Sequence, residues 1–219
     1  MKKYIWLFAL LVSANAALAE TTPLDAAIEK LQHDWAVANY KTPDGDKEVV
    51  FKKLSEEAHK VAADNPGRAE PLIWEAIILG DYAREKGVLI DIKVAEKARD
   101  LLFDAEKIDP NALGGSLYTT LGLLHYKVLG WPFGFGDKDK ARGYLEKALK
   151  IDPDGIDTNY VYADFLLGRR EYAKALEHFK KALNAPARAG REDADAGRKA
   201  DIQKGIDDSI NWAKHQAEE

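Results

Sequence analysis

The sequence predicts an all-α fold, a solenoid of about four helix pairs with a C-terminal capping helix. The first observation behind this prediction is a helix ending that occurs four times, with small and apolar residues at steps of three and four followed by a proline. The second is an amphipathic segment after the last copy, because an α-solenoid needs such a segment to cover its open end.

Residues 1–19 have the pattern of a secretory signal peptide. Lys2 and Lys3 precede a short apolar run, and Ala17-Leu18-Ala19 forms a small-x-small cleavage site before Glu20. The run is shorter than the ~20 residues that a bilayer span takes, and no later segment approaches that length. We therefore expect an exported, periplasmic protein, cleaved near Ala19, without stable insertion in a membrane.

The composition excludes several classes of function. The chain has 219 residues, of which 46% are hydrophobic and 32% charged, a formal charge of −5 and no cysteine. The acidic balance argues against a nucleic-acid partner, because phosphate binding needs a basic surface. A chain without cysteine forms no disulfide, thiolate zinc site or iron–sulfur cluster and has no cysteine nucleophile.

Each helix ending places three residues on one helical face, with a proline just beyond. The small residues on that face let a neighbouring helix approach closely, so we expect Ala141, Ala148, Ala175 and Ala182 to be buried, with Gly122 and Ala163 at the crossings. The four copies are Leu54, Ala58, Val61 and Pro66; Ala98, Leu102, Ala105 and Pro110; Ala141, Leu145, Ala148 and Pro153; and Ala175, Phe179, Ala182 and Pro186.

A partner helix precedes each ending. In the most regular unit Asn159, Tyr162 and Ala163 share one face, and the preceding unit has Leu121-Gly122 in the same relative place. This arrangement resembles the tetratricopeptide repeat (TPR), whose pattern is an aromatic, Leu-Gly, then Ala, Phe, Ala and Pro over 34 residues. The match is strong over residues 115–188, moderate over 70–114 and weak over 21–69.

Three units carry extra residues between their two helices. Seven extra residues fall within 129–137, six near 87–93, and a comparable stretch covers 41–46. Loops that join the two helices of successive repeats leave a solenoid along the same edge, so the three insertions predict an elaborated functional edge. We expect Leu89 and Ile90 to pack against the 129–137 loop.

That loop, Gly130-Trp-Pro-Phe-Gly-Phe-Gly136, is the most distinctive segment. Its aromatics either fold back over the helices as a structural staple or form the rim of a binding site, and Trp131 and Phe133 are the candidates for the second role. In that second case we expect Trp131, Tyr126 and Tyr160 to face a common space.

The TPR resemblance implies a peptide- or protein-binding groove on the face of the first helix of each repeat. These positions mix aromatic residues with both signs of charge, and packing between helices remains an alternative for the tyrosines. They are Trp74, Asp81, Arg84, Tyr126, Lys127, Tyr160 and Asp164.

The tail has an apolar stripe of Ile202, Ile206, Ile210 and Ala213, which predicts a capping helix near 198–216. Residues 187–197 are the one candidate linker and are too few to separate two domains. We therefore expect a single domain over residues 20–219.

The search for catalytic chemistry finds no motif. The five histidines, His125 and His178 among them, lack metal-ligand spacing, and there is no nucleophile elbow, P-loop or strand-framed Gly-rich motif. We predict neither enzymatic activity nor a metal or cofactor, and we expect both helical histidines to be ordinary core or surface residues.

The runs 130–167 and 185–202 resemble exported proteobacterial TPR proteins that are similar to the T component of TPR-associated TRAP transporters, although the acylated N-terminal cysteine of that component is absent. We expect a non-catalytic periplasmic binding or adaptor protein that mediates protein–protein interaction. The alternative is a TRAP-transporter accessory protein that binds a small organic solute. The resemblance implies a protein or peptide partner, such as a solute-binding protein, and is compatible with a homo-oligomer.

Overall fold

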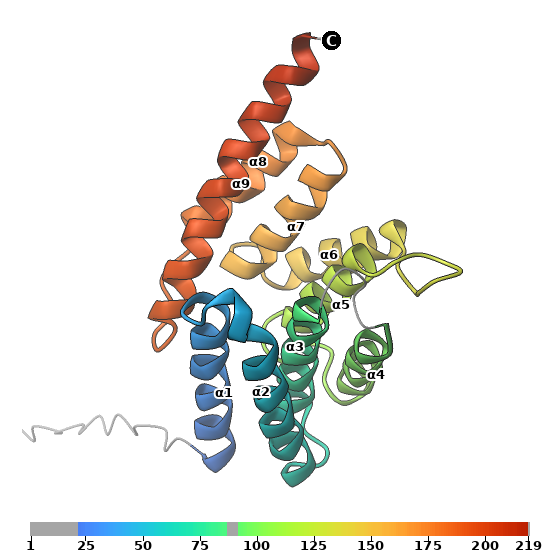
Figure 1. The fold of residues 1–219 in the computed structure, drawn as a ribbon, viewed down its shortest axis with the longest axis vertical. Helices are drawn as coiled ribbons and strands as arrows, with labels where there is room; N and C mark the ends of the chain where they lie inside the picture. The colour runs from blue at the N-terminus through green and yellow to red at the C-terminus, as the bar shows by residue number, and fades with distance from the viewer. Residues whose placement is uncertain (1–21, 87–91, 219) are drawn as a thin grey trace, which may run out of the picture.

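Helices account for all the regular structure in the described part of the chain. The computed structural model describes residues 22–86 and 92–218. These residues contain no β-strand, only an isolated bridge between Gly130 and Gly136, which confirms the all-α prediction. The helices are α1 (Pro23–Tyr40), α2 (Asp44–Asp64), α3 (Ala69–Glu85), α4 (Ile92–Ile108), α5 (Ser116–Lys127), α6 (Lys138–Ile151), α7 (Ile156–Gly168), α8 (Tyr172–Leu183) and α9 (Glu192–Glu218) (Figure 1).

Local sequence signals place several helix ends. Thr22 and Asp25 form a reciprocal capping box at the start of α1, with Pro23 as its first residue. Asp137 caps α6, because its Oδ1 accepts hydrogen bonds from the backbone N–H groups of Asp139 and Lys140. The insertion expected at 41–46 is shorter than predicted, since α2 already begins at Asp44.

The helices form four pairs, α1–α2, α3–α4, α5–α6 and α7–α8, and α9 follows as an additional helix. The odd-numbered helices contact one another in sequence, α1 with α3, α3 with α5, α5 with α7 and α7 with α9, and α9 in turn contacts α1. They therefore form a closed ring. In Figure 1, α9 runs beside α8 and α7, and its N-terminal end lies next to α1.

Close approach of small residues builds the core between helices. Ala141, Ala148, Ala175, Ala182 and Ala163 are fully inaccessible to solvent, which confirms the predicted crossings. No larger residue fits at position 122 of α5, because a Cβ on Gly122 would lie 2.5 Å from Cγ of Leu145 on α6.

The predicted stripe of the last helix is buried over only part of its length. Ile202 is inaccessible and Ile206 is 8% exposed, whereas Ile210 is 37% exposed and Ala213 is exposed. The helix expected near 198–216 lies inside a longer one, α9. In the described ranges, no helix is both long enough and apolar enough to cross a membrane.

We expect the substitutions Ala148→Leu and Ala182→Leu each to lower the free energy of unfolding by about 1–3 kcal/mol, because three added carbon atoms have no space at these crossings. Urea denaturation followed by circular dichroism measures the change. Ala173→Leu, at an exposed position of α8, is the matched control and should leave stability nearly unchanged. Unchanged unfolding of both core variants would contradict this packing.

Candidate functional site

Helix α9 covers two of the residues that the sequence assigns to a ligand groove. The guanidinium of Arg191, just before α9, lies 5.3 Å from the ring centroid of Trp74 on α3. The guanidinium of Arg198 lies 4.2 Å from that of Tyr160 on α7. Trp74 is only 5% exposed. The first part of α9 therefore occupies a face of the odd-numbered helices that the TPR resemblance leaves open for a ligand.

Asp81 and Arg84 of α3 instead hold this helix to α1. The indole Nε1–H of Trp35 donates to Asp81 Oδ2 at 2.6 Å. Arg84 donates to Asp81 Oδ1 at 2.6 Å and to Oδ1 of Asn39 at 3.0 Å. The charge of Arg84 is thus already balanced by a neighbouring carboxylate.

Tyr126, Lys127 and Asp164 form the equivalent contact between α5 and α7. Lys127 Nζ lies 2.7 Å from Asp164 Oδ2 and 4.2 Å from the ring centroid of Tyr126. The hydroxyl of Tyr126 donates to the carbonyl oxygen of Asp164 at 3.4 Å, and burial raises the pKa of Tyr126. For both predicted tyrosines, Tyr126 and Tyr160, the geometry favours the alternative of packing between helices.

A cluster of arginines and aspartates joins the start of α9 to α7 and α1. Asp157 at the start of α7 accepts from Arg198 at 2.8 Å and from Arg188 at 2.7 Å. Arg188 also donates to Asp195 at 2.6 Å. On the other side Asp201 lies 3.3 Å from Arg198 and accepts from the Tyr40 hydroxyl of α1 at 3.2 Å.

In this geometry the carboxylate of Asp157 and the neighbouring guanidinium groups stabilise each other's charged forms. Burial by itself raises the pKa of Asp157, but the positive charges of Arg198 and Arg188 outweigh it and hold this pKa well below its usual range. Burial by itself lowers the pKa of Arg198, and the negative charge of Asp157 outweighs it, so this pKa is raised. Asp157 and Arg198 are therefore both ionised at neutral pH.

Apart from Asp157 and Tyr40, the residues of this cluster lie in the predicted linker, residues 187–197, or at the beginning of the predicted capping helix. One signal could have identified them: Arg188, Arg191 and Arg198 are concentrated near the C-terminus of an acidic chain. Nothing local to these residues identifies Asp157, which lies some 30 positions earlier, as their common partner.

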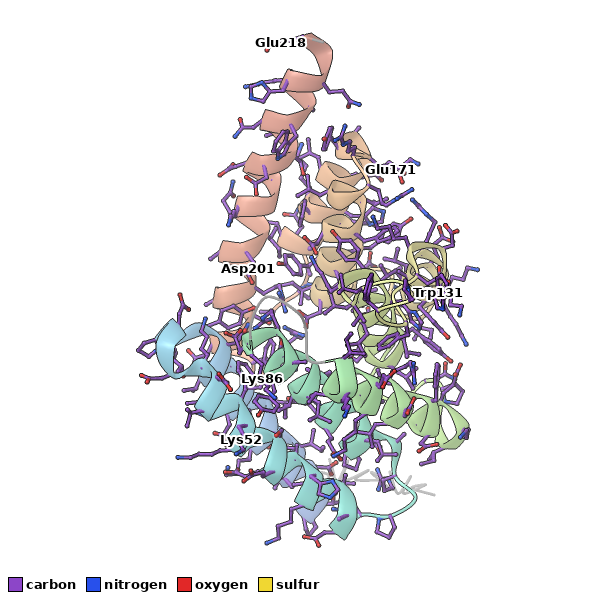
Figure 2. All side chains as sticks on the ribbon, turned by 45° about the vertical axis from the view of Figure 1, so that its right-hand side comes forward. Lys52, Lys86, Trp131, Glu171, Asp201 and Glu218 are labelled. Atoms are coloured by element: carbon purple, nitrogen blue, oxygen red, sulfur yellow. The ribbon has the colours of Figure 1, made fainter. Side chains whose placement is uncertain are left out.

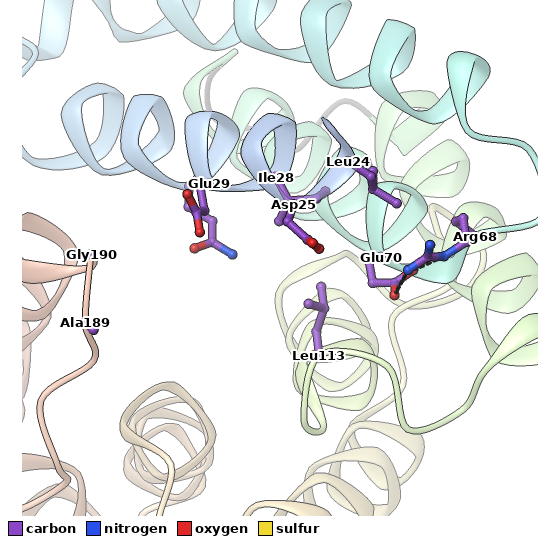
Figure 3. Close-up of a pocket in the computed structure, with 10 residues that line it drawn as sticks. Leu24, Asp25, Ile28, Glu29, Arg68, Glu70, Leu113, Ala189 and Gly190 are labelled. Carbon is purple, nitrogen blue, oxygen red and sulfur yellow. Dashed lines mark hydrogen bonds and ion pairs between the residues drawn. The ribbon is translucent and has the colours of Figure 1, made fainter. Parts of the chain in front are cut away.

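A cavity of about 650 Å³ opens near the N-terminal ends of α1, α3, α5 and α9 (Figure 3). We call it the ring cavity. One side is formed by α1 and the others by the turns that lead into α3, α5 and α9. It is lined by Leu24, Asp25, Ile28, Glu29, Gln32, Arg68, Glu70, Leu113, Ala189 and Gly190. No residue predicted for the groove is among these.

The aromatic residues of the 128–137 loop differ: one folds back as a structural staple, and two are placed as at the rim of a binding site. Phe135 folds back, edge-on to His125 with ring centroids 5.2 Å apart, and carries the guanidinium of Arg99 at 4.5 Å from its centroid. Trp131 and Phe133 point outward and are 90% and 71% exposed. In Figure 2, Trp131 lies at the edge of the molecule, apart from Asp201 on α9.

Leu89 and Ile90, predicted to pack on this loop, lie outside the described residues. Both helical histidines are packed as expected. His125 is 4% exposed with Nδ1 3.2 Å from the carbonyl oxygen of Phe135, and His178 Nδ1 lies 2.9 Å from Oδ1 of Asn159. Burial lowers the pKa of both histidines. Among the described residues no three His, Asp or Glu side chains converge as metal ligands.

We expect Asp157→Asn to lower the free energy of unfolding by about 1–3 kcal/mol at pH 7, because it weakens two charged hydrogen bonds at a site that is one-third exposed. The effect should shrink below about pH 4, where the aspartate of the unfolded wild-type chain takes up a proton while the folded one stays ionised. Urea denaturation at pH 7 and pH 3 measures both.

Asp154→Asn is the matched control, since its side chain is 80% exposed and its one ion pair, to Lys181, spans 3.9 Å. It should change stability by less than about 0.5 kcal/mol at either pH. If Asp157→Asn lowers the free energy of unfolding equally at both pH values, the charge of Asp157 contributes nothing to stability.

Comparison with known proteins identifies the architecture. No family model and no curated protein matches the chain. Among solved structures, the TPR protein TTC0263 of Thermus thermophilus superposes with a TM-score of 0.51 and 17% identity, over 83% of this chain and 99% of that one. MamA gives 0.44 and 17% over 81% and 99%, and PilF of Pseudomonas aeruginosa gives 0.37 and 16% over 89% and 92%. The likeness to TTC0263 shows that this chain has the fold of a TPR α-solenoid.

Proposed function

We propose that the protein is a non-catalytic, periplasmic TPR-type adaptor that binds a partner protein through the tip of the 128–137 loop. The observation that carries this proposal is the outward position of Trp131 and Phe133, with Leu129 beside them at 41% exposure. The most exposed ring, Trp131, offers an area that is costly to leave in water, since an aromatic side chain has about 150–250 Å² of surface.

The loop presents these rings on an ordered base. Gly136 N–H donates to the carbonyl of Leu129 at 2.8 Å, and Asp137 N–H donates to that of His125 at 2.8 Å. The contacts of Phe135 fasten the same base to α4 and α5. A rigid loop loses little conformational entropy on binding, and tryptophan is among the residues that most often dominate interface energies.

The same proposal explains why the other predicted groove residues need not bind the partner. Asp81, Arg84, Lys127 and Asp164 already form ion pairs or hydrogen bonds within the protein, whereas the loop tip has unused apolar surface. The partner that fits the tip is a protein with an apolar pocket for two aromatic rings, and a solute-binding protein is one such partner.

A second function, an accessory role in TRAP-type transport with a small organic solute as ligand, is favoured by a different observation. The ring cavity has the volume of a small-molecule site, and Leu24, Ile28 and Leu113 give it an apolar wall. This solute site is separate from the aromatic loop.

We expect the double variant Trp131→Ala/Phe133→Ala to lose most of its partner binding while its stability is unchanged, because both side chains are exposed. Affinity purification of the tagged protein from periplasmic extract, with mass spectrometry, identifies partners, and calorimetry with the purified partner gives the affinity. The drop should be at least tenfold, which corresponds to about 1.4 kcal/mol.

The control for this experiment is Trp212→Ala, a second exposed tryptophan, at 56%, on α9. It should retain every partner. Equal binding by wild type and the loop variant would exclude the loop tip as the interface.

The proposed export to the periplasm leads to a separate prediction. N-terminal sequencing of the protein from its native cell should begin at or near Glu20, because the small residues before it form the cleavage site. Recovery of a chain that retains Met1 in the cytoplasmic fraction would contradict the periplasmic assignment.

A further inference from the structure

The base of the 128–137 loop contains a buried titratable group, the imidazole of His125 on α5. The residue is only 4% exposed. Its ring contacts two aromatic rings, with the centroid of Phe135 at 5.2 Å in an edge-on arrangement and that of Tyr144 at 5.4 Å in a stacked one. The loop therefore covers one side of the imidazole, and α6 covers another.

The hydrogen bonding of this imidazole determines which nitrogen takes up a further proton. Nδ1 lies 3.2 Å from the carbonyl oxygen of Phe135, which can only accept, so Nδ1 carries the proton of the neutral ring. Nε2 is then the basic nitrogen, and it has no hydrogen-bond partner among the described residues. A proton on Nε2 would create a buried N–H group without an acceptor, which is unfavourable.

The charged groups around His125 come from α4, α6 and the end of the loop. Burial is the largest effect on the imidazole and lowers the pKa of His125. The positive charges of Lys140 on α6 and Arg99 on α4 lower it further, although Arg99 is itself paired with Asp100 at 2.8 Å. Asp137 and the loop carbonyl bonded to Nδ1 act in the opposite direction and do not outweigh burial.

The loop, rather than α6, is the element that can move away from His125. The crossing of α5 and α6 is fixed where Gly122 meets Leu145, which is inaccessible to solvent. The loop is held at its base by the contacts of Phe135 and by the Asp137 N–H, which donates to the His125 carbonyl at 2.8 Å. Separation of Phe135 from the imidazole would let water reach Nε2 and accept its hydrogen bond.

We propose that His125 is a pH-sensitive switch for the aromatic loop: when Nε2 takes up a proton in mildly acidic solution, Phe135 leaves the imidazole and the loop tip loses the fixed position in which it binds its partner. This inference rests on the adaptor function proposed above and adds regulation to the same site. It does not involve the ring cavity.

The difference in pKa between the two positions of the loop sets the direction of the effect. A histidine in water has a pKa of about 6.5, and that of the buried His125 is lower. As the pH falls, the open loop therefore binds the proton before the closed one does. The closed loop is favoured above about pH 6.5 and loses this advantage progressively below it.

The first readout is the loop itself, which needs no partner. The full mature chain is titrated from pH 7.5 to pH 4.5, and ¹⁵N NMR follows the imidazole of His125 and the backbone amides of Gly134, Gly136 and Asp137. These amides should change with the same midpoint as Nε2. The amides of Gly136 and Asp137 should lose about tenfold in protection against hydrogen exchange, after correction for the intrinsic dependence on pH.

His125→Asn should abolish the acid-induced change, because asparagine keeps an N–H donor near the place of Nδ1 and does not titrate. His178→Asn is the matched control. Burial lowers the pKa of His178 too, and its Nδ1 is also hydrogen-bonded, to Asn159 at 2.9 Å, but it lies on α8. Its loop amides should respond as in wild type. Circular dichroism checks folding, and His125→Phe, which keeps an aromatic ring, replaces His125→Asn if that variant does not fold.

The second readout is the affinity for the partner purified with the tagged protein. Calorimetry should show affinity about threefold lower at pH 5.0 than at pH 7.5 for wild type, because only the fraction of molecules with a closed loop is competent to bind. His125→Asn should lack this loss. The comparison with His125→Asn removes any contribution from groups of the partner that titrate in the same range.

Loop amides that stay unchanged while Nε2 of His125 gains its proton overturn the switch. So does a His125 that remains neutral down to pH 4.5, or an acid-induced change that persists in His125→Asn. Equal affinity for the partner at both pH values, with the loop open at the lower one, overturns the regulation. If the loop opens as expected but Trp131→Ala/Phe133→Ala binds the partner like wild type, the adaptor interface fails and the switch itself stands.

Discussion

The hydrogen-bonded ion pair between Arg198 of α9 and Asp157 of α7 is the interaction on which the closed arrangement of this protein depends. Each helix pair can form from contacts between small apolar residues close in sequence. The contact of α9 with α1 has no such local basis. It combines polar pairs far apart in the chain, Tyr40 with Asp201, 161 positions away, and Lys41 with Asp193, 152 positions away, with the burial of Ala194 in the core cluster of α1 and the close approach of Gly197 to the Tyr40 ring. Arg198 bonds Asp157 and Asp201 together and so links both sides of this junction.

The burial of this cluster explains why its ion pairs count for more than those on the outside of the helices. Exposed pairs such as Lys107 with Asp104, at 75% and 60% side-chain exposure, are screened by water and contribute little. Arg198 is only 13% exposed and Asp195 only 8%. Asp157 is one-third exposed but pairs with both Arg188 and Arg198, so the charges in this cluster interact more strongly than those of the exposed pairs.

Because the ring is closed, part of the face that an open solenoid uses for binding is covered. An open solenoid offers a continuous concave face to its partners. Here Trp74 and Tyr160, on that face, lie under arginines at the start of α9, and Asp81, Arg84, Lys127 and Asp164 join neighbouring helices. Within the described part of the chain, the outward rings of the 128–137 loop and the ring cavity are not taken up by such contacts. They lie on different elements of the fold.

The sequence by itself determined the helical repeat. Ala141, Ala148, Ala175 and Ala182 recur at helical spacing, and only small residues allow the close crossings that the structure shows, so the periodicity predicted both the helices and their buried faces. The tertiary structure decided which aromatic ring of the loop is packed. Phe135 folds back because its ring contacts His125 and Arg99 of neighbouring helices. Only the tertiary structure decided that α9 returns to α1. That contact joins residues more than 150 positions apart, and it is supported by Asp157 of α7, which meets arginines 31 and 41 positions later. No local pattern of residues encodes either pairing.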